Sequence, residues 1–326
     1  MSDTNAIKAR LLQANYPLYA VLDGAQFDDL PAMLFDNDFA HKPLYLDMGS
    51  EKRDIALTTP QLVRFDTWKY WENDKTAQER LECLLSLLPQ TCAAVFWEYE
   101  GDSKLLYRHL RTINNIMVPR DEDTPPMPDP LDPEGETFGN TEFHEQVLFR
   151  HADANVMAQV LPEMDEPQLG RILGPAKAVV FAPTEDWGDG AISFEAPDLP
   201  EQTLAEIKRK PLQLNKPTMD RIGNKNLMGS RRKIVRYLRK VAKDETADMS
   251  DDALYKVVLK CEKTGNELGL KSEKTHGTYA YLAVLTNGMT LTDPEVKGYI
   301  SESPHPDRAV HDIMAQLSKS PDGAAA

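Results

Sequence analysis

Short apolar runs alternate with amphipathic segments through the first 185 residues, and this alternation constrains the fold most strongly. The run over 19–22 enters a turn at Asp23 and Gly24, and an amphipathic segment over 30–34 follows it. This order is typical of a buried strand that feeds a helix. Repeated strand–helix alternation predicts an α/β domain whose sheet is covered by helices.

The other predicted elements of this part follow from the same two patterns. Continuous apolar runs predict buried strands, and leucines spaced three and four apart predict amphipathic helices. The predicted strands are 43–46, 93–97, 146–149 and 178–181, and the predicted helices are 76–88 and 105–113.

Beyond about residue 200 the strand signal fades and helix signals replace it. Ser230 is a candidate N-cap for a helix through Lys243, and Ser250 is a candidate N-cap for the next one. Asp293 and Pro294 predict a further short helix start. We therefore expect an α/β domain over 1–200 and an all-helical lobe over 201–326.

An acidic, proline-rich segment interrupts the first domain at about 119–140. It holds seven acidic residues and one arginine, and its prolines lack amide donors. Low hydrophobicity and high charge predict a mobile surface insertion rather than a stable element. Peptide recognition through an extended proline-rich conformation is the alternative interpretation.

The net charge of −15 is unevenly distributed. Residues 205–243 contain 13 Lys or Arg against Glu206 and Asp220, so this segment carries +11 and the remainder −26. The overall acidity argues against general nucleic-acid binding. The basic segment favours an acidic partner or an acidic face within the molecule.

The basic segment predicts a helix with two distinct faces. At about 100° per residue, four cations fall on one narrow face and four apolar side chains on the opposite one. We expect the apolar face to dock on the domain and the cationic face to bind a partner, although an ordinary solvated face also fits. Nucleic acid would require interleaved aromatic or glycine-rich elements. The predicted partner-binding residues are Arg232, Arg236, Arg239 and Lys243, and the apolar ones are Ile234, Tyr237, Leu238 and Val241.

Motifs for catalysis, cofactors and metals are missing from the sequence. There is no glycine-rich phosphate loop and no G-x-S-x-G. His144 and Glu145 begin like a zinc-binding H-E-x-x-H, but Leu148 stands at the second histidine. We predict no cofactor, no membrane segment and a cytoplasmic protein with reduced cysteines. A hydrolase assembled from distant residues stays open as an alternative.

Several blocks occur in a distinctive order between residues 15 and 185. The blocks are Tyr19–Ala25, Thr59–Val63, Phe96–Glu98, Leu106 with His109–Arg111, Met117-Val118, Val147–Arg150 with Asp153 and Val156, Leu161-Pro162, Gln168-Leu169 and Leu173–Pro175. Together they resemble the bacterial type VI secretion effector adaptors, also called effector chaperones, built on domain-of-unknown-function family 4123. The region from Ser230 onward resembles the helical lobe often attached to this domain.

This resemblance implies a non-enzymatic cytoplasmic protein that holds a secreted effector and helps load it onto the VgrG spike. The family supplies no catalytic residues to carry over. Many relatives read aspartate-proline-arginine where this chain has Asp153, Ala154 and Asn155, and the acidic insertion is also unusual. Within this framework Gly24 permits a tight exit from the strand and Asp23 caps the following helix. A nucleic-acid-binding module using 205–243 is the alternative function.

Overall fold

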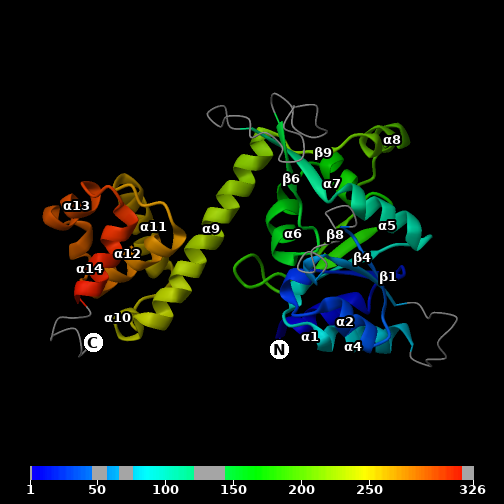
Figure 1. Ribbon diagram of the computed structural model, residues 1–326, viewed down its shortest axis with the longest axis horizontal. Helices are drawn as coiled ribbons and strands as arrows, with labels where there is room; N and C mark the ends of the chain where they lie inside the picture. The colour runs from blue at the N-terminus through cyan, green and yellow to red at the C-terminus, as the bar shows by residue number, and fades with distance from the viewer. Residues whose placement is uncertain (1, 46–56, 66–75, 121–143, 318–326) are drawn as a thin grey trace. The chain divides into compact units, whose positions relative to one another are not determined.

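The computed structural model describes residues 2–45, 57–65, 76–120 and 144–317 (Figure 1). The chain divides into two compact units, Met1–Asn224 and Lys225–Ala326. Apart from positions 119 and 120, the acidic insertion predicted at 119–140 lies outside the described residues.

A six-stranded antiparallel sheet forms the centre of the first unit, in the order β2-β3-β1-β4-β7-β8. The central strands are apolar on both sides, which explains their continuous apolar sequence. The predicted strands at 19–22, 93–97 and 178–181 are confirmed. The six strands are β1 (Leu18–Leu22), β2 (Ala40–Pro43), β3 (Gln61–Arg64), β4 (Ala94–Glu98), β7 (Ala178–Phe181) and β8 (Ile192–Glu195).

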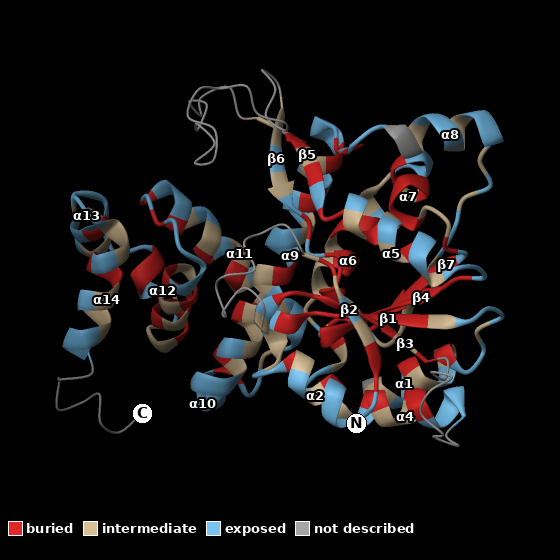
Figure 2. Cartoon of the chain, turned by 45° about the vertical axis from the view of Figure 1, so that its right-hand side comes forward, coloured by how far each residue is buried: buried red, intermediate tan, exposed pale blue. Residues whose placement is uncertain are grey.

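Helices cover both faces of this sheet, as predicted (Figure 2). Val21 and Trp97 point into a core with Leu110, whereas Ala20 and Phe96 point into the opposite core. The two-residue period of the strands separates these two cores. The first face packs against α5 (Ser103–Thr112), α6 (Ala154–Val160) and α7 (Glu166–Leu173), and the second against α1 (Ser2–Leu11), α2 (Leu30–Asp36) and α4 (Ala77–Leu87).

The strand predicted at 43–46 lies three residues nearer the N-terminus in the structure, where it is β2 (Ala40–Pro43). It pairs with β3 through His41 and Lys42 and ends at Pro43. Proline has no amide proton for a sheet, so it fits the end of an edge strand. The apolar residues that suggested the strand follow it, and Leu44 is buried in the core.

A second sheet of three strands has the order β6-β5-β9. It consists of β6 (His144–Leu148), β5 (Asn115–Pro119) and β9 (Leu212–Gln213), with β5 and β9 parallel. The strand predicted at 146–149 corresponds to β6. Leu212 and Leu214 reach the core of the first unit.

The first unit extends further than residue 200. Helix α8 (Glu201–Arg209) packs on α7, and Ile222 belongs to the core that contains Val21 and Trp97. The division therefore falls within α9 (Lys216–Val241), at Asn224.

Among its described residues, the second unit is all helical, as predicted. Ser250 and Asp293 are N-caps, accepting hydrogen bonds from Ala253 N and Glu295 N. Leu238, Val258 and Tyr279 lie in its buried core. Its helices after α9 are α10 (Lys243–Thr246), α11 (Asp251–Glu267), α12 (Glu273–Leu285), α13 (Pro294–Ser301) and α14 (Pro306–Leu317).

Candidate functional site

Helix α9 is longer than its sequence suggested. It begins at Lys216 instead of after Ser230, because Asn215 accepts a hydrogen bond from Thr218 N at 2.9 Å and caps the helix. Gly223 and Gly229 lie within the helix, although glycine disfavours helix interiors. Ala242 leaves the helical conformation, with φ −123° and ψ 55°, and so separates α9 from α10.

The inward face of α9 differs in part from the prediction. Ile234, Leu238 and Ala242 are buried in the core of the second unit. Tyr237 and Val241 were expected to face inward, but they are 41% and 39% exposed. The apolar surface of the helix therefore continues beyond the core and into contact with solvent.

The four predicted partner-binding cations do not form one continuous helical face. Arg232 is exposed and Arg236 is half-buried on α9, but Lys243 lies in α10, beyond the break at Ala242. Arg239 turns toward the connection between α10 and α11. This separation follows from the helix break, which the periodicity argument did not include.

Arg239 holds the α10–α11 connection together. Its guanidinium donates to the carbonyl oxygens of Thr246 and Met249 and to Asp251 Oδ1. The contacts to Met249 O and Asp251 Oδ1 are both 2.6 Å. Because its donors are used within the unit, Arg239 has a structural role that its position in the sequence did not reveal.

Arg231, which was not selected from the sequence, makes a bidentate pair with Glu262 at 2.7 and 2.8 Å. The hydrogen bond to Glu262 raises the pKa of Arg231 above its usual value. The same bond lowers the pKa of Glu262. This pair joins α9 to α11 in the fork geometry that arginine favours.

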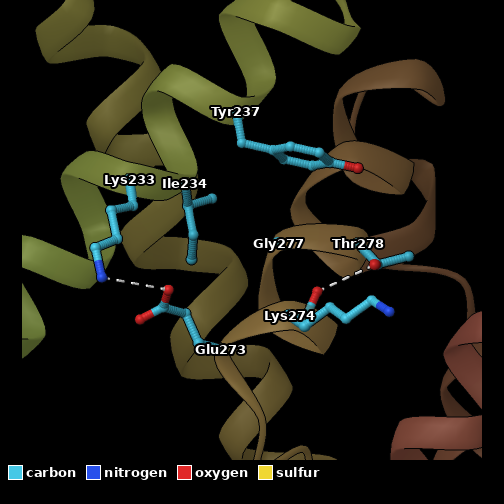
Figure 3. Close-up of a pocket in the computed structure, with 7 residues that line it drawn as sticks. All are labelled: Lys233, Ile234, Tyr237, Glu273, Lys274, Gly277 and Thr278. Carbon is cyan, nitrogen blue, oxygen red and sulfur yellow. Dashed lines mark hydrogen bonds and ion pairs between the residues drawn. The ribbon is translucent and has the colours of Figure 1, made fainter. Parts of the chain in front are cut away.

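A groove of about 310 Å³ lies between α9 and α12 (Figure 3). We call it the Tyr237 groove. The ring of Tyr237 meets Tyr281 edge-on, with centroids 6.4 Å apart. Burial, followed by the neighbouring Tyr281, raises the pKa of Tyr237. The groove is lined by Lys233, Ile234, Tyr237, Glu273, Lys274, Gly277 and Thr278.

The rim of the Tyr237 groove is charged and its interior is apolar. Lys233 Nζ lies 3.9 Å from Glu273 Oε1, so these two charges offset each other. Lys274 has no acidic partner among the described residues. Gly277 forms part of the wall, where an added Cβ would lie 3.8 Å from the Tyr237 ring. The Tyr237 groove is therefore suited to bind a partner segment in which an apolar side chain lies next to a carboxylate.

In the first unit, two blocks of the resemblance, Tyr19–Ala25 and Val147–Arg150 with Asp153, meet at one ion cluster, in which Asp23 is buried and Arg150 is exposed. Arg150 donates to Asp23 Oδ2 at 2.5 Å, and its guanidinium lies 3.5 Å from Asp153 Oδ2. Asp23 also accepts from Ala25 N and caps a short 3-10 helix, whereas Asp29 caps α2. The expectation that Asp23 caps the amphipathic helix after the turn is therefore wrong, because the short 3-10 helix comes between them; Asp23 instead caps that 3-10 helix and pairs with Arg150.

The groups around this cluster are held in unreactive protonation states. Burial, followed by the charge of Asp23, raises the pKa of Tyr45 to about 12. Burial also raises the pKa of the Cys92 thiol. A phenol or thiol that stays protonated at neutral pH is a poor nucleophile. The geometry therefore favours a structural role for this cluster.

Two further features limit what the described residues can do. Among these residues, no group of three or more His, Cys, Asp or Glu side chains is arranged so that it could hold a metal ion. Within the same ranges, no helix has the length and apolar character needed to cross a membrane.

Comparisons with protein-family models, curated proteins and solved structures give no match.

Proposed function

We propose that this protein is a non-enzymatic cytoplasmic adaptor that binds a type VI secretion effector and helps load it onto the VgrG spike. The ordered sequence blocks motivate this proposal. The contact between Asp23 and Arg150 supports it, because it joins two of those blocks across 127 residues of sequence. In this proposal the sequence blocks form the structural framework of the first unit, and the partner proteins bind at its surface and at that of the second unit.

The Tyr237 groove is the observation that carries the proposal. A tyrosine that is 41% exposed beside a partly apolar groove is a suitable anchor for a protein partner. We assign the groove to a segment of the effector that carries an apolar side chain and a carboxylate. Apolar burial supplies most of the affinity, and Lys274 orients the segment.

The charge of the second unit gives little support to the nucleic-acid alternative. Residues 225–326 contain 16 Lys or Arg and 14 Asp or Glu, a net charge of only +2. Arg231 and Arg239 are paired with carboxylates of the same unit. Nucleic-acid binding depends on a concentrated positive surface and would fall steeply with added salt.

Affinity capture after co-expression tests the proposal. The tagged protein is produced together with a candidate toxin effector and with a VgrG protein of the same system. We expect both proteins to be recovered, and recovery of the toxin to persist in moderate salt because apolar contacts carry most of the affinity. Recovery of neither protein would contradict the adaptor function.

A further inference from the structure

A second open groove, with a volume of about 610 Å³, lies on the first unit beside α2 and the end of α4. We call it the acidic groove. Its apolar wall is formed by side chains from both helices and from the loops next to them. The groove is lined by Gln26, Phe27, Asp28, Asp29, Met33, Asp36, Asn37, Leu87 and Pro89.

The apolar wall of the acidic groove is partly exposed. Phe27, Met33 and Leu87 are only half-buried, although each packs against the core that contains Ala20 and Phe96. Pro89 is exposed. A partner that covered these side chains would remove apolar surface from water at a site already held in place by the core.

The charges around this wall have one sign. Asp28, Asp29 and Asp36 line the groove, and no Lys, Arg or His lines it. Asp29 accepts from Ala32 N at 2.9 Å and caps α2. Asp28 and Asp36 are exposed and make no ion pair among the described residues. Two carboxylates are therefore available to a cationic partner without breaking an internal contact.

The rest of the first unit reinforces this negative charge. The chain carries −15 and residues 225–326 carry +2, so residues 1–224 carry −17. A field of this sign attracts cationic segments and repels nucleic acid and anionic lipid surfaces. The Tyr237 groove, by contrast, has two lysines and one glutamate in its lining.

We propose that the acidic groove docks a basic amphipathic segment of a partner protein, in which lysines or arginines flank one or two apolar side chains. The apolar side chains cover Phe27 and Met33, and the cations pair with Asp28 and Asp36. This inference does not rest on the adaptor function. It does suit an adaptor, because a protein with two partners needs two surfaces that discriminate between them.

Fluorescence anisotropy with the full-length protein tests the inference. The probe is a labelled synthetic helix of about 18 residues with Leu and Phe on one face and Lys on its flanks; its twin has Glu in place of Lys. We expect the Lys probe to bind and the Glu probe not to. Affinity for the Lys probe should fall about tenfold in Asp28→Asn/Asp36→Asn. Met33→Lys should weaken binding at least as much, because it puts a cation in the apolar wall.

The matched control is Glu100→Gln/Glu206→Gln, which changes the net charge equally at two exposed carboxylates outside the groove. It should change the affinity less than about twofold. Equal losses in the two double variants would overturn the inference in favour of general charge attraction. Failure of the Lys probe to bind would overturn the inference as well. Concentration-dependent dimerisation that Met33→Lys abolishes would also overturn it, because the occupant of the groove would then be a second copy of the chain.

Discussion

Gly24 lies where the backbone approaches a neighbouring loop too closely for a side chain. A Cβ there would lie 2.6 Å from the carbonyl oxygen of Thr59 and 2.8 Å from that of Leu57. Both are backbone atoms and cannot rotate away. We expect Gly24→Ala to lower the free energy of unfolding by about 1–3 kcal/mol, measured by chemical denaturation.

Gly223→Ala is the matched control for this substitution. Nothing lies within 4 Å of a Cβ at Gly223, which is inside helix α9. Alanine there should leave stability unchanged or raise it by up to about 1 kcal/mol. Similar losses in the two variants would show that the close contact at Gly24 does not control stability.

His151 provides a pH-dependent test of the core. Complete burial, followed by the charge of His109, lowers the pKa of His151 to about 3. Between about pH 6.5 and 3 the unfolded state therefore binds a proton that the folded state does not, and stability falls as the pH falls through this window. His151 should contribute a slope approaching about 1.4 kcal/mol per pH unit.

The variant His151→Gln removes this titration. Its unfolding free energy, measured by denaturation from pH 7 to pH 5, should depend less on pH than that of the wild type. The variant is also expected to be less stable overall, because His151 Nε2 lies 2.8 Å from Asn114 Oδ1 in the buried core. Parallel pH profiles would contradict the assigned role of His151.

At the scale of elements, Arg239 determines how α9 connects to α11. Lysine retains the charge but cannot donate to two carbonyls and a carboxylate in the same geometry. We expect Arg239→Lys to destabilise the second unit by about 1–3 kcal/mol in thermal or chemical unfolding. Arg232→Lys, at an exposed position on the same helix, should change stability by less than about 0.5 kcal/mol. Equal changes in stability in the two variants would contradict the structural role assigned to Arg239.

The sequence revealed elements that carry a strong local pattern. The continuous apolar run at 93–97 correctly predicted a strand, and Ser250 correctly predicted the start of a helix. The N-terminal part of α9 was missed because Gly223 and Gly229 weaken its pattern, although Asn215 and Pro217 signal its beginning.

The candidate sites were less accessible to sequence reasoning. The cationic face assumed an unbroken helix, whereas Ala242 interrupts it before Lys243. The Tyr237 groove depends on Gly277, which is distant in sequence from α9. The pairing of Asp23 with Arg150 likewise spans 127 residues, beyond the range of any local periodicity.

At the scale of the whole molecule, the two units have separate hydrophobic cores. We expect two transitions in differential scanning calorimetry, because each core loses its own packing cooperatively. Gly24→Ala should lower one transition temperature and Arg239→Lys the other. A single transition that both variants shift equally would show that the units unfold together.

The two grooves differ in charge, and each belongs to one unit. The acidic groove has three carboxylates and no cation in its lining, whereas the Tyr237 groove has two lysines and one glutamate. Opposite charge preferences would keep two partners from competing for the same surface. The adaptor proposal gains support from this separation.

The affinity of the effector for glycine variants of the second unit tests the central claim most directly. Gly277→Leu fills the Tyr237 groove, whereas Gly298→Leu adds the same side chain on α13, outside the groove lining. With the fold verified by circular dichroism, we predict that Gly277→Leu weakens effector binding by at least about tenfold and that Gly298→Leu leaves it nearly unchanged. Equal affinity of the wild type and Gly277→Leu for the effector would contradict the account.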